Sequence, residues 1–333
     1  MKRKEIVIVT PALASANNGN WQTAWRWARF LGGDYRVHIT DAWAPGRPGA
    51  DAALMIALHA RRSAASVAAW HAAHPQRPLV LVLTGTDLYR DIDTDADAQR
   101  SLALAQRLVV LNEAGPARLP PALRDRVTVC LQSATPRRAR PKTMRRLRAL
   151  MVGHLREEKQ PGTYFDAARA LASRHDILFD HIGGGLDPVL AAEARALAAQ
   201  QPLYRWLGAL PHGATRGRIA AAHVLVHPSR MEGGAHVVTE AVVSATPVLA
   251  SRIDGNVGLL GPGYDGFFEP GDTAGLVTLL QRVRDDPSML SHLAAQCAQR
   301  APLFDPARER RTVLSMVARL LPPHPQETAD ECP

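Results

Sequence analysis

Short apolar runs alternate with longer segments of mixed polarity over residues 1–135. The run Ile6–Val9 is continuously apolar, as expected for a parallel strand that is buried on both faces. Residues 21–31 instead carry apolar side chains at helical spacing and are followed by two glycines, which end a helix well. Further strands are predicted at 35–40, 52–58, 79–84 and 108–111, with helices at 63–74 and 96–106 between them. The alternation predicts a doubly wound α/β domain.

The same alternation starts again near residue 150. Strands are predicted at 150–153, 177–182, 203–207, 223–227 and 247–250, with helices between them and a long last helix. Residues 133–147 hold Pro136 and Pro141 among many arginines, a composition typical of an interdomain linker. The predicted parts are an N-terminal domain at 1–135, a basic linker at 136–148, a C-terminal domain at 149–304, a last helix at 305–321 and a loose tail at 322–333.

The stretch Pro228–Glu240 joins a predicted strand to a predicted helix through a glycine turn. Gly233 and Gly234 allow the backbone to turn tightly, and the helix that follows presents unpaired N–H groups to an anion. Glu232 and Glu240 stand on either side of this turn. Carboxylates repel phosphate but accept hydrogen bonds from sugar hydroxyls. The pattern therefore favours a nucleotide-sugar, which has a diphosphate in the middle and a sugar at each end.

Composition limits the class of protein. The 333 residues suit two domains, and a content of 46% hydrophobic and 21% charged residues is globular. The net charge of +9 favours anionic ligands. Cys130, Cys297 and Cys332 are far apart and odd in number, which indicates a reducing, cytoplasmic compartment. No apolar run approaches the ~20 residues of a membrane span. Ile6–Val9 is also short for a signal peptide, so we expect a buried first strand and no integral membrane segment.

Alternating aspartates at 91, 93, 95 and 97 raise the question of a metal site. A calcium loop that begins at Asp91 needs Gly at its sixth position and Glu at its twelfth, but Ala96 and Leu102 stand there. We therefore predict no metal site. These acids are interpreted as a solvated loop that favours the start of the next helix.

The motif Glu-x7-Glu after Pro-Ser, followed by Thr-Pro-Val, resembles the donor site of the GT-B glycosyltransferases, in the branch of the retaining sucrose-synthase and mannosyltransferase types. The resemblance implies two Rossmann-like domains that face each other across a cleft, and a last helix that crosses back to the first domain. It also implies that Glu240 holds the ribose hydroxyls and that Glu232 lies at the transferred sugar. The backbone amides that would hold the sugar and the pyrophosphate are those of Ala235, His236, Val237 and Val238.

Cations for the donor diphosphate are expected at the start of the second domain. The family shows Gly-Arg-Leu here with a Lys five residues after the Arg, and Lys159 takes the Lys position. His154 stands at the Arg position, so His154 itself, Arg156 or Arg230 takes over the role of the missing guanidinium. Two cations beside a departing diphosphate neutralise charge that grows in the transition state. The predicted catalytic residues are Lys159, Arg156, Arg230 and Glu232.

The first domain offers polar residues after its strands. Gly19 and Asn20 end the loop after the first strand, where the family has a glycine-rich ligand loop, and they are predicted to touch the donor. The stretch His59–Arg62 follows the third strand and forms a cationic pocket for an anion. Many relatives have a histidine near Thr84, and its absence here argues against a histidine-centred mechanism at that loop. The predicted acceptor-binding residues are Asn20, Thr23, His59, Arg61, Arg62, Thr84 and Thr86.

The departures from the family make the chain most similar to one subgroup, the selenosugar synthases of selenoneine biosynthesis. The stretches that carry this resemblance are 10–11 with 17–20, 57–63, 83–89, 152–161 and 228–240. It implies a UDP-sugar donor, UDP-GlcNAc or UDP-glucose, and selenophosphate as the nucleophile. The implied product is a 1-seleno-β-sugar, formed after the Se–P bond is cleaved. The resemblance implies no cofactor and no metal, and pathway partners that supply selenophosphate and consume the selenosugar.

Two other functions stay open. A conventional GT-B glycosyltransferase would act on a lipid or saccharide hydroxyl, and Trp21, Trp25 and Trp27 could line its acceptor groove. A basic binding protein would instead use the arginine-rich residues 137–148 against a nucleic acid or a membrane surface. Few aromatic residues stand between these arginines to stack on bases, so we expect no nucleic-acid partner.

Overall fold

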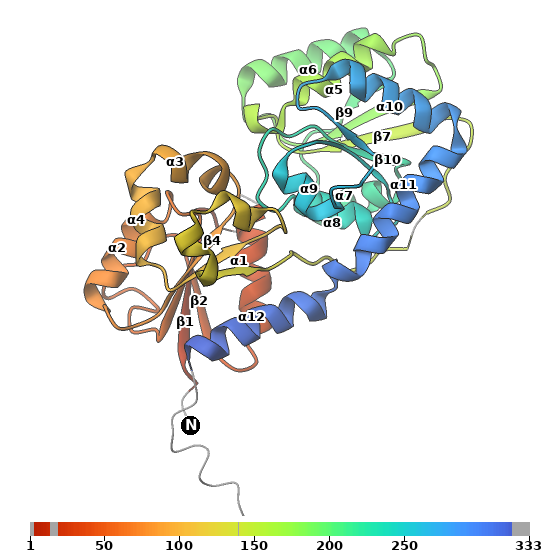
Figure 1. The fold of residues 1–333 in the computed structure, drawn as a ribbon. Helices are drawn as coiled ribbons and strands as arrows, with labels where there is room; N and C mark the ends of the chain where they lie inside the picture. Colours follow the sequence, from red (N-terminus) through yellow and green to blue (C-terminus); the bar gives the residue numbers. More distant parts are fainter. Residues whose placement is uncertain (1–2, 14–18, 139, 322–333) are drawn as a thin grey trace, which may run out of the picture. The chain divides into compact units, whose positions relative to one another are not determined.

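The computed structural model describes residues 3–13, 19–138 and 140–321. The chain divides into two compact units, Met1–Gln132 with Pro306–Pro333 and Ser133–Asp305, and each unit has its own parallel sheet (Figure 1). The prediction of two doubly wound α/β domains is confirmed. Asn17, Asn18, Cys332 and the predicted tail lie outside the described residues.

The first unit is built on a six-stranded parallel sheet in the order β2-β1-β3-β4-β5-β6. Its strands are β1 (Glu5–Val9), β2 (Arg36–Thr40), β3 (Leu54–Leu58), β4 (Leu79–Leu83), β5 (Arg107–Val110) and β6 (Val127–Val129). Its α-helices are α1 (Gly19–Leu31), α2 (Ala64–Ala73), α3 (Ile92–Thr94), α4 (Ala96–Leu104) and α12 (Pro306–Leu320). The chain order reverses at β1 and β3, and ligands bind at the carboxyl ends of strands at such a switch point.

Both faces of the first sheet are buried. The side chains of β1 alternate, with Ile6 and Ile8 in one core and Val7 and Val9 in the other. The first core also contains Trp27 of α1 and side chains of α12, and the second contains side chains of α2 and α4. Burial on both faces explains why the strand sequences are continuously apolar and do not alternate.

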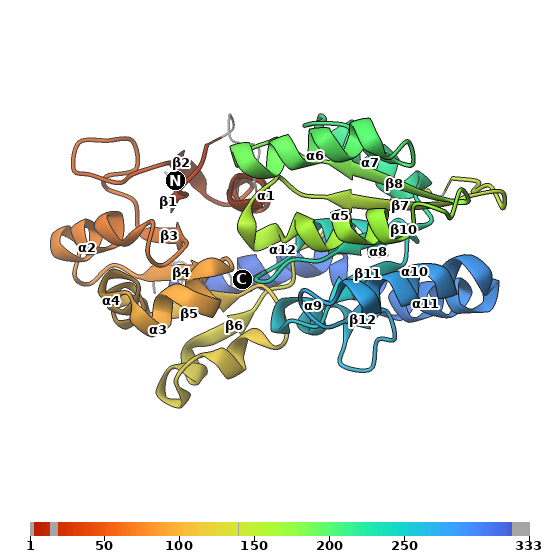
Figure 2. The same cartoon turned by 90° about the horizontal axis from the view of Figure 1, so that it is seen from above.

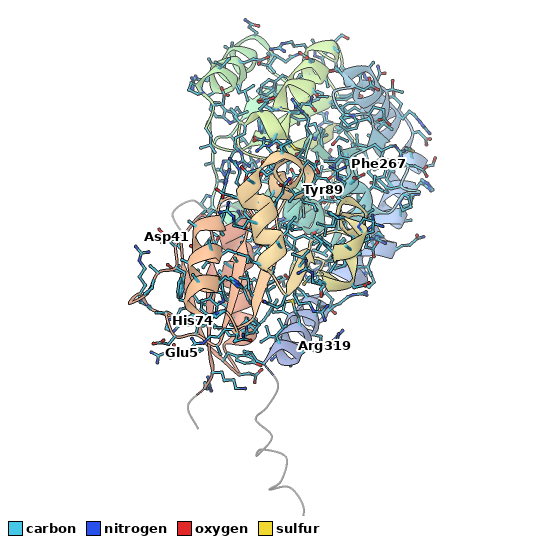
Figure 3. All side chains as sticks on the ribbon, turned by 60° about the vertical axis from the view of Figure 1, so that its left-hand side comes forward. Glu5, Asp41, His74, Tyr89, Phe267 and Arg319 are labelled. Carbon is cyan, nitrogen blue, oxygen red and sulfur yellow. The ribbon has the colours of Figure 1, made fainter. Side chains whose placement is uncertain are left out.

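An aromatic cluster closes the second core beside α2. The fully buried ring of Trp70 lies edge-on to Trp43, with 5.4 Å between the ring centroids. His74, labelled in Figure 3, packs edge-on against Trp70 at 4.8 Å. Its Nε2 lies 2.8 Å from the Ala50 carbonyl oxygen, so this nitrogen carries a proton and donates. His74 is therefore a packed structural residue.

The last helix, α12, packs against α1 within the first unit (Figure 1). Glu309 of α12 is 2% exposed. Its carboxylate accepts hydrogen bonds from Arg26 Nε at 2.7 Å and from Trp27 Nε1 at 2.8 Å. Such partners are needed because a buried carboxylate without them costs several kcal/mol. One buried carboxylate thus ties the two helices together.

The second unit has a parallel sheet in the order β12-β11-β10-β7-β8-β9. Its strands are β7 (Leu147–Val152), β8 (Ile177–Ile182), β9 (Tyr204–Trp206), β10 (Val224–His227), β11 (Val248–Ser251) and β12 (Phe267–Phe268). Its α-helices are α5 (Pro161–Ala170), α6 (Pro188–Gln200), α7 (His212–Ala221), α8 (His236–Val242), α9 (Asp254–Leu260), α10 (Thr273–Asp285) and α11 (Pro287–Arg300). Figure 2 shows β7, β8 and β10 side by side. Helix α5 packs against α6 and α10, whereas α8 packs against α7, α9 and α11.

Some features differ from the sequence prediction. The pattern does not reveal β6 and β12, because runs of three and two residues are too short to show a period. Trp27 is fully buried in the first core and cannot line an acceptor groove, while Trp25 is 43% exposed. The basic stretch expected as a linker belongs to the second unit and leads into β7. Among the helices of the described residues, none is long and apolar enough to cross a bilayer.

Replacing Glu309 with alanine should destabilise the first unit by about 3 kcal/mol, because it removes the buried carboxylate that pairs with the half-buried charge of Arg26 and accepts the Trp27 Nε1–H. All tryptophans except Trp206 lie in this unit, so urea unfolding followed by tryptophan fluorescence reports on it. Asp41→Ala, in the same unit, removes an exposed pair with Arg47 and should cost less than about 1 kcal/mol. Equal losses in the two variants would contradict the role given to Glu309.

Candidate functional site

The ends of two strands define a ligand-binding edge in the second unit. β7 and β10 are neighbours in its sheet, and the chain order reverses between them. Their carboxyl ends therefore form the topological switch point of this unit. Residues 153–159 follow β7 and residues 228–240 follow β10. Both segments carry predicted donor-binding residues.

Lys159 and Glu232 form an ion pair between these two segments. Lys159 Nζ lies 2.5 Å from Glu232 Oε1, and His227 Nε2, at the end of β10, lies 3.3 Å from the same oxygen. Glu232 is 9% exposed. Burial alone would raise the pKa of the Glu232 carboxyl, but Lys159 and His227 outweigh burial and hold that pKa well below its usual range. The carboxylate is therefore charged and fixed in place.

Arg230 adds two more links between the segments. Its NH1 donates to Glu157 Oε1 at 3.0 Å, and its backbone N–H donates to the Glu158 carbonyl oxygen at 2.9 Å. One nitrogen of the Arg230 guanidinium thus binds the Glu157 carboxylate, in the turn before Lys159. Arg230 positions this turn against the segment that carries Glu232.

Two glycines allow the backbone to pack this closely. A Cβ on Gly255, in α9, would lie 1.9 Å from the Glu232 carbonyl oxygen. A Cβ on Gly183, after β8, would lie 1.8 Å from the Gly153 carbonyl oxygen. A side chain at either position would force the backbone apart, so glycine is required there. Gly255 supports the segment after β10, and Gly183 supports the loop after β7.

His154 and Arg156 lie beside Lys159 in the loop after β7. The Gly184 N–H donates to His154 Nδ1 at 2.9 Å, so Nε2 of the neutral ring carries the proton and can donate. Burial, followed by the charges of Arg156 and Lys159, lowers the pKa of His154 and favours this neutral form. Arg156 is half-buried, and its Nε has no hydrogen-bond partner among the described residues. The loop thus carries two cations and one neutral N–H donor.

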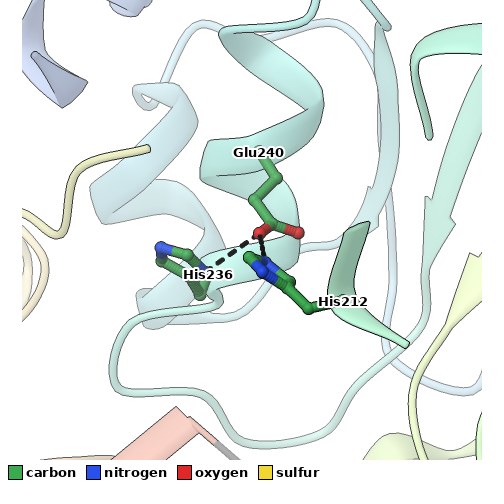
Figure 4. Close-up of side chains that lie close together, drawn as sticks. All are labelled: His212, His236 and Glu240. Atoms are coloured by element: carbon green, nitrogen blue, oxygen red, sulfur yellow. Dashed lines mark hydrogen bonds and ion pairs between the residues drawn. The ribbon is translucent and has the colours of Figure 1, made fainter. Parts of the chain in front are cut away.

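Glu240 is held by nitrogen-bearing side chains from two helices. His212 Nε2 lies 2.6 Å and His236 Nδ1 lies 3.4 Å from Glu240 Oε1 (Figure 4). Arg216 Nε lies 3.7 Å from the same oxygen. Burial alone would raise the pKa of the Glu240 carboxyl, but hydrogen bonds and charges from these side chains lower it to about 2.

The two carboxylates share one arrangement. The closest contacts of Glu240 with His212, His236 and Arg216 are all to Oε1, and the closest contacts of Glu232 with Lys159 and His227 are also to Oε1. Within the described part of the chain, Oε2 of neither carboxylate accepts a hydrogen bond. Nitrogen-bearing side chains therefore fix one oxygen, while the other keeps its capacity to accept a hydrogen bond from a ligand hydroxyl.

The predicted backbone donors lie at the start of α8. The Val238 N–H donates to the Ala235 carbonyl oxygen at 2.8 Å, so it is committed within the first turn of the helix. His236 Nε2 lies 3.0 Å from the Ser133 carbonyl oxygen, and Val237 follows it in the same turn. Helix α8 has only seven residues, so its dipole is a weaker ligand for an anion than the cations after β7.

In the first unit, a buried carboxylate joins the ends of β3 and β4. Asp87 is 0% exposed. Its Oδ2 accepts the Ala60 N–H at 2.9 Å, and its Oδ1 accepts the N–H groups of Thr84 and Gly85 at 2.9 and 2.8 Å. Because Ala60 follows β3 and Thr84 follows β4, Asp87 brings the predicted acceptor residues of both loops together.

His59 is strained and forms a polar pair with Thr86. It takes a left-handed φ of 73°, which is costly for a residue with a side chain. The Arg62 N–H donates to His59 Nδ1 at 3.3 Å, so Nε2 carries the proton and donates to Thr86 Oγ1 at 3.0 Å. Burial lowers the pKa of His59 more than the charge of Asp87 raises it. The Thr86 hydroxyl then has its own proton to donate.

The two arginines after His59 have different surroundings. Arg61 Nε pairs with Asp91 Oδ2 at 2.9 Å, and Arg90 Nε pairs with the other oxygen of Asp91 at 3.0 Å. Arg62 is exposed and makes no ion pair with a described residue. Arg62 is therefore the better placed of the two to meet an anion from solution.

Gly19, Asn20 and Thr23 lie in the first turns of α1. Thr23 is buried, and its hydroxyl donates to the Gly19 carbonyl oxygen at 2.8 Å and accepts a hydrogen bond from Gln132 Nε2. Its proton is thus committed within the first unit, so in this arrangement Thr23 does not donate to a bound anion. Asn20 is half-buried at the start of the helix.

Several residues that shape these sites are not predicted from the sequence. His212 and Arg216 reach Glu240 from α7, and His212 lies 28 residues away in the chain. Asp87 shows no motif that reveals its three backbone partners. His227 carries a signal that could have identified it, because a histidine that ends a buried apolar strand beside a ligand motif faces the switch point.

The chain folds into two doubly wound units, and charged side chains lie at the β7–β10 switch point of the second unit. This combination is typical of the GT-B class of fold. The chain belongs to the family of group 1 glycosyl transferases. The family model, described as glycosyl transferases group 1, matches residues 133–302, which is nearly the whole second unit.

Solved structures share the fold at low sequence identity. Sucrose-phosphate synthase from Thermosynechococcus elongatus is 16% identical, with a TM-score of 0.76 over 96% of this chain and 99% of that one. Anabaena Alr3699/HepE is 15% identical, with a TM-score of 0.73 over 95% of this chain and 100% of that one. S. aureus TarM is 12% identical, with a TM-score of 0.65 over 81% of this chain, which spans only 55% of TarM. No curated protein matches the sequence.

The low pKa of Glu240 predicts a pH dependence of stability. The pKa of the Glu240 carboxyl is near 4.5 in the unfolded chain and about 2 in the folded one. At pH values above about 4.5, the ionised carboxylate therefore stabilises the folded state by about 3 kcal/mol. This contribution is lost as the pH falls from about 4.5 to about 2. The free energy difference between wild type and Glu240→Gln, measured by urea unfolding, should therefore shrink across this window. A constant difference would contradict the assignment.

Proposed function

We propose that this chain moves a sugar from a UDP-sugar, UDP-GlcNAc or UDP-glucose, onto the selenium of selenophosphate. The product is a 1-seleno-β-sugar for selenoneine biosynthesis, and UDP and phosphate are released. Membership of the glycosyl transferases supports sugar transfer. Alr3699/HepE, a protein of similar fold, was solved with UDP-glucose and with UDP and glucose, which supports a UDP-sugar. The selenium acceptor is supported by the resemblance to the selenosugar synthases.

The paired carboxylates carry the proposal. Glu240 accepts the ribose hydroxyls through Oε2, and Glu232 accepts hydroxyls of the transferred sugar in the same way. In each carboxylate, nitrogen-bearing side chains hold Oε1 and leave Oε2 for the ligand. A carboxylate oxygen that is oriented in advance loses little conformational entropy when it accepts a hydrogen bond from a sugar hydroxyl. The positions of the two carboxylates on either side of a glycine turn in the sequence favour a ligand with a sugar at each end.

The loop after β7 takes the diphosphate. Lys159 and Arg156 neutralise the charge that grows on the leaving UDP, and His154 donates an uncharged N–H in place of the family arginine. Arg230 acts as a positioning residue, because its contacts with Glu157 and Glu158 hold this loop against Glu232. With these cations in place, the reaction we propose uses no metal and no cofactor.

Selenophosphate meets the edge of the first unit at Arg62, His59 and Thr86. Its selenium attacks the anomeric carbon, the bond from that carbon to the diphosphate oxygen breaks, and UDP leaves with the electron pair. Water then cleaves the Se–P bond and releases phosphate. The anionic selenium needs less help from a general base than a sugar hydroxyl. We place the reaction in the cytoplasm, since Cys130 and Cys297 are free thiols.

Purified protein with a panel of UDP-sugars should release UDP when selenophosphate is added. UDP release only with a sugar alcohol or a lipid would instead identify a conventional glycosyltransferase. Binding of random DNA that falls steeply with salt, without UDP binding, would identify a basic nucleic-acid-binding protein. Neither of these outcomes is expected.

Glu240→Gln should raise the KM for the UDP-sugar about tenfold and leave kcat nearly unchanged. A ribose hydroxyl is bound equally in the ground state and the transition state, and a hydrogen bond to a charged group is worth about 1.5–3 kcal/mol. Glu269→Gln, at an exposed carboxylate of the same unit, serves as the matched control and should change neither constant. If the two variants show the same KM and kcat, Glu240 does not bind the ribose.

A further inference from the structure

Three side chains that commonly bind metals meet in the second unit: His212, His236 and Glu240 (Figure 4). Each offers one ligand atom, and these atoms all lie within 4.8 Å of one another. Two histidines and a glutamate bind Zn²⁺ in proteins and leave a fourth position open to water. We propose that these residues form a binding site for a divalent transition-metal ion such as Zn²⁺, and that the bound metal blocks the ribose end of the donor site.

The distances suit a metal after a small side-chain movement. Around a tetrahedral zinc ion with bonds of about 2.0–2.2 Å, the ligand atoms lie about 3.4 Å apart. His236 Nδ1 and Glu240 Oε1 are already 3.4 Å apart. His212 Nε2 lies 2.6 Å from Oε1 and must retreat slightly. It can do so, because His212 is the first residue of α7 and its side chain is 46% exposed.

His236 is oriented as a metal-binding histidine usually is. Its Nε2 lies 3.0 Å from the Ser133 carbonyl oxygen, so this nitrogen carries a proton and donates. Metal-binding histidines almost always donate their other ring N–H in this way. In the neutral ring, the lone pair of Nδ1 then faces Glu240 Oε1. Two such lone pairs repel each other, so either a proton or a metal ion belongs between them.

Arg216 limits the affinity of the site. Its Nε lies 3.7 Å from Glu240 Oε1, and its NH2 donates to the Thr135 carbonyl oxygen at 2.6 Å. The guanidinium is therefore held near any bound metal, and its charge weakens metal binding without removing a ligand atom. We expect reversible binding that competes with the nucleotide.

Metal binding and metal inhibition have different requirements. Binding needs only the three ligand atoms. Inhibition also rests on the proposed function, because it requires that the ribose occupies Glu240. A metal ion on Glu240 Oε1, with water in its fourth position, would occupy the space beside Oε2 in which the proposed function places the ribose hydroxyls. The two parts are therefore tested separately.

Co²⁺ is the probe for binding, because its visible absorption reports tetrahedral coordination by protein ligands. Tag-free, full-length protein should develop this absorption, and Zn²⁺ should abolish it. His212→Gln and His236→Gln should each weaken Co²⁺ binding by about tenfold or more. His292→Gln is the matched control, since His292 pairs with the exposed carboxylate of Asp265 at 2.7 Å, and it should bind Co²⁺ as wild type does.

No absorption in wild type, or equal absorption in all variants, would overturn the metal site. A thiolate charge-transfer band would place the metal on a cysteine and overturn it as well. For the competition, uridine is used because it has the ribose hydroxyls but no phosphate to chelate the metal. Uridine should displace Co²⁺, and Zn²⁺ should raise the KM for the UDP-sugar without lowering kcat.

The outcomes separate the two proposals. If Co²⁺ binds through the histidines and uridine does not compete, the metal site stands and the ribose assignment to Glu240 is wrong. If uridine binds and Co²⁺ does not, the metal site is wrong and the proposed function is untouched.

Discussion

The ion pair between Lys159 and Glu232 is the interaction on which the ligand edge of the second unit depends. Glu232 is buried, and a buried carboxylate without a cation would cost several kcal/mol. Because Lys159 follows β7 and Glu232 follows β10, the pair also fixes the two loops of the switch point against each other. Gly255 completes the constraint, since only glycine lets α9 pass so close to the Glu232 carbonyl oxygen.

The polar edges of both units are built by the same physical rule. A buried carboxylate takes its partners from elements that are distant in sequence, and it thereby sets the position of the loops that meet the ligand. Asp87 does this with backbone N–H groups in the first unit, and Glu232 and Glu240 do it with lysine, histidine and arginine side chains in the second. Because these partners fix each carboxylate in advance, an atom such as Glu240 Oε2 is already oriented to accept a hydrogen bond from a ligand hydroxyl.

Much of the fold can be predicted from the sequence, because continuous apolar runs indicate the buried strands and the glycine turn between Glu232 and Glu240 indicates strand, turn and helix. The partners of these residues cannot be predicted in this way. His212 reaches Glu240 across 28 residues of chain, and only the packing of α7 against α8 brings them together. Thr23 has the right chemistry for an acceptor ligand, but its place in α1 commits its proton to the Gly19 carbonyl oxygen.

A crystal structure of the protein bound to UDP would show whether the β7–β10 edge holds the nucleotide. We expect ribose hydroxyls within hydrogen-bond distance of Glu240 Oε2 and a diphosphate beside Lys159 and Arg156, with the pair between Lys159 and Glu232 retained. A nucleotide bound away from the β7–β10 edge, or a Glu240 side chain turned from the ribose, would contradict it.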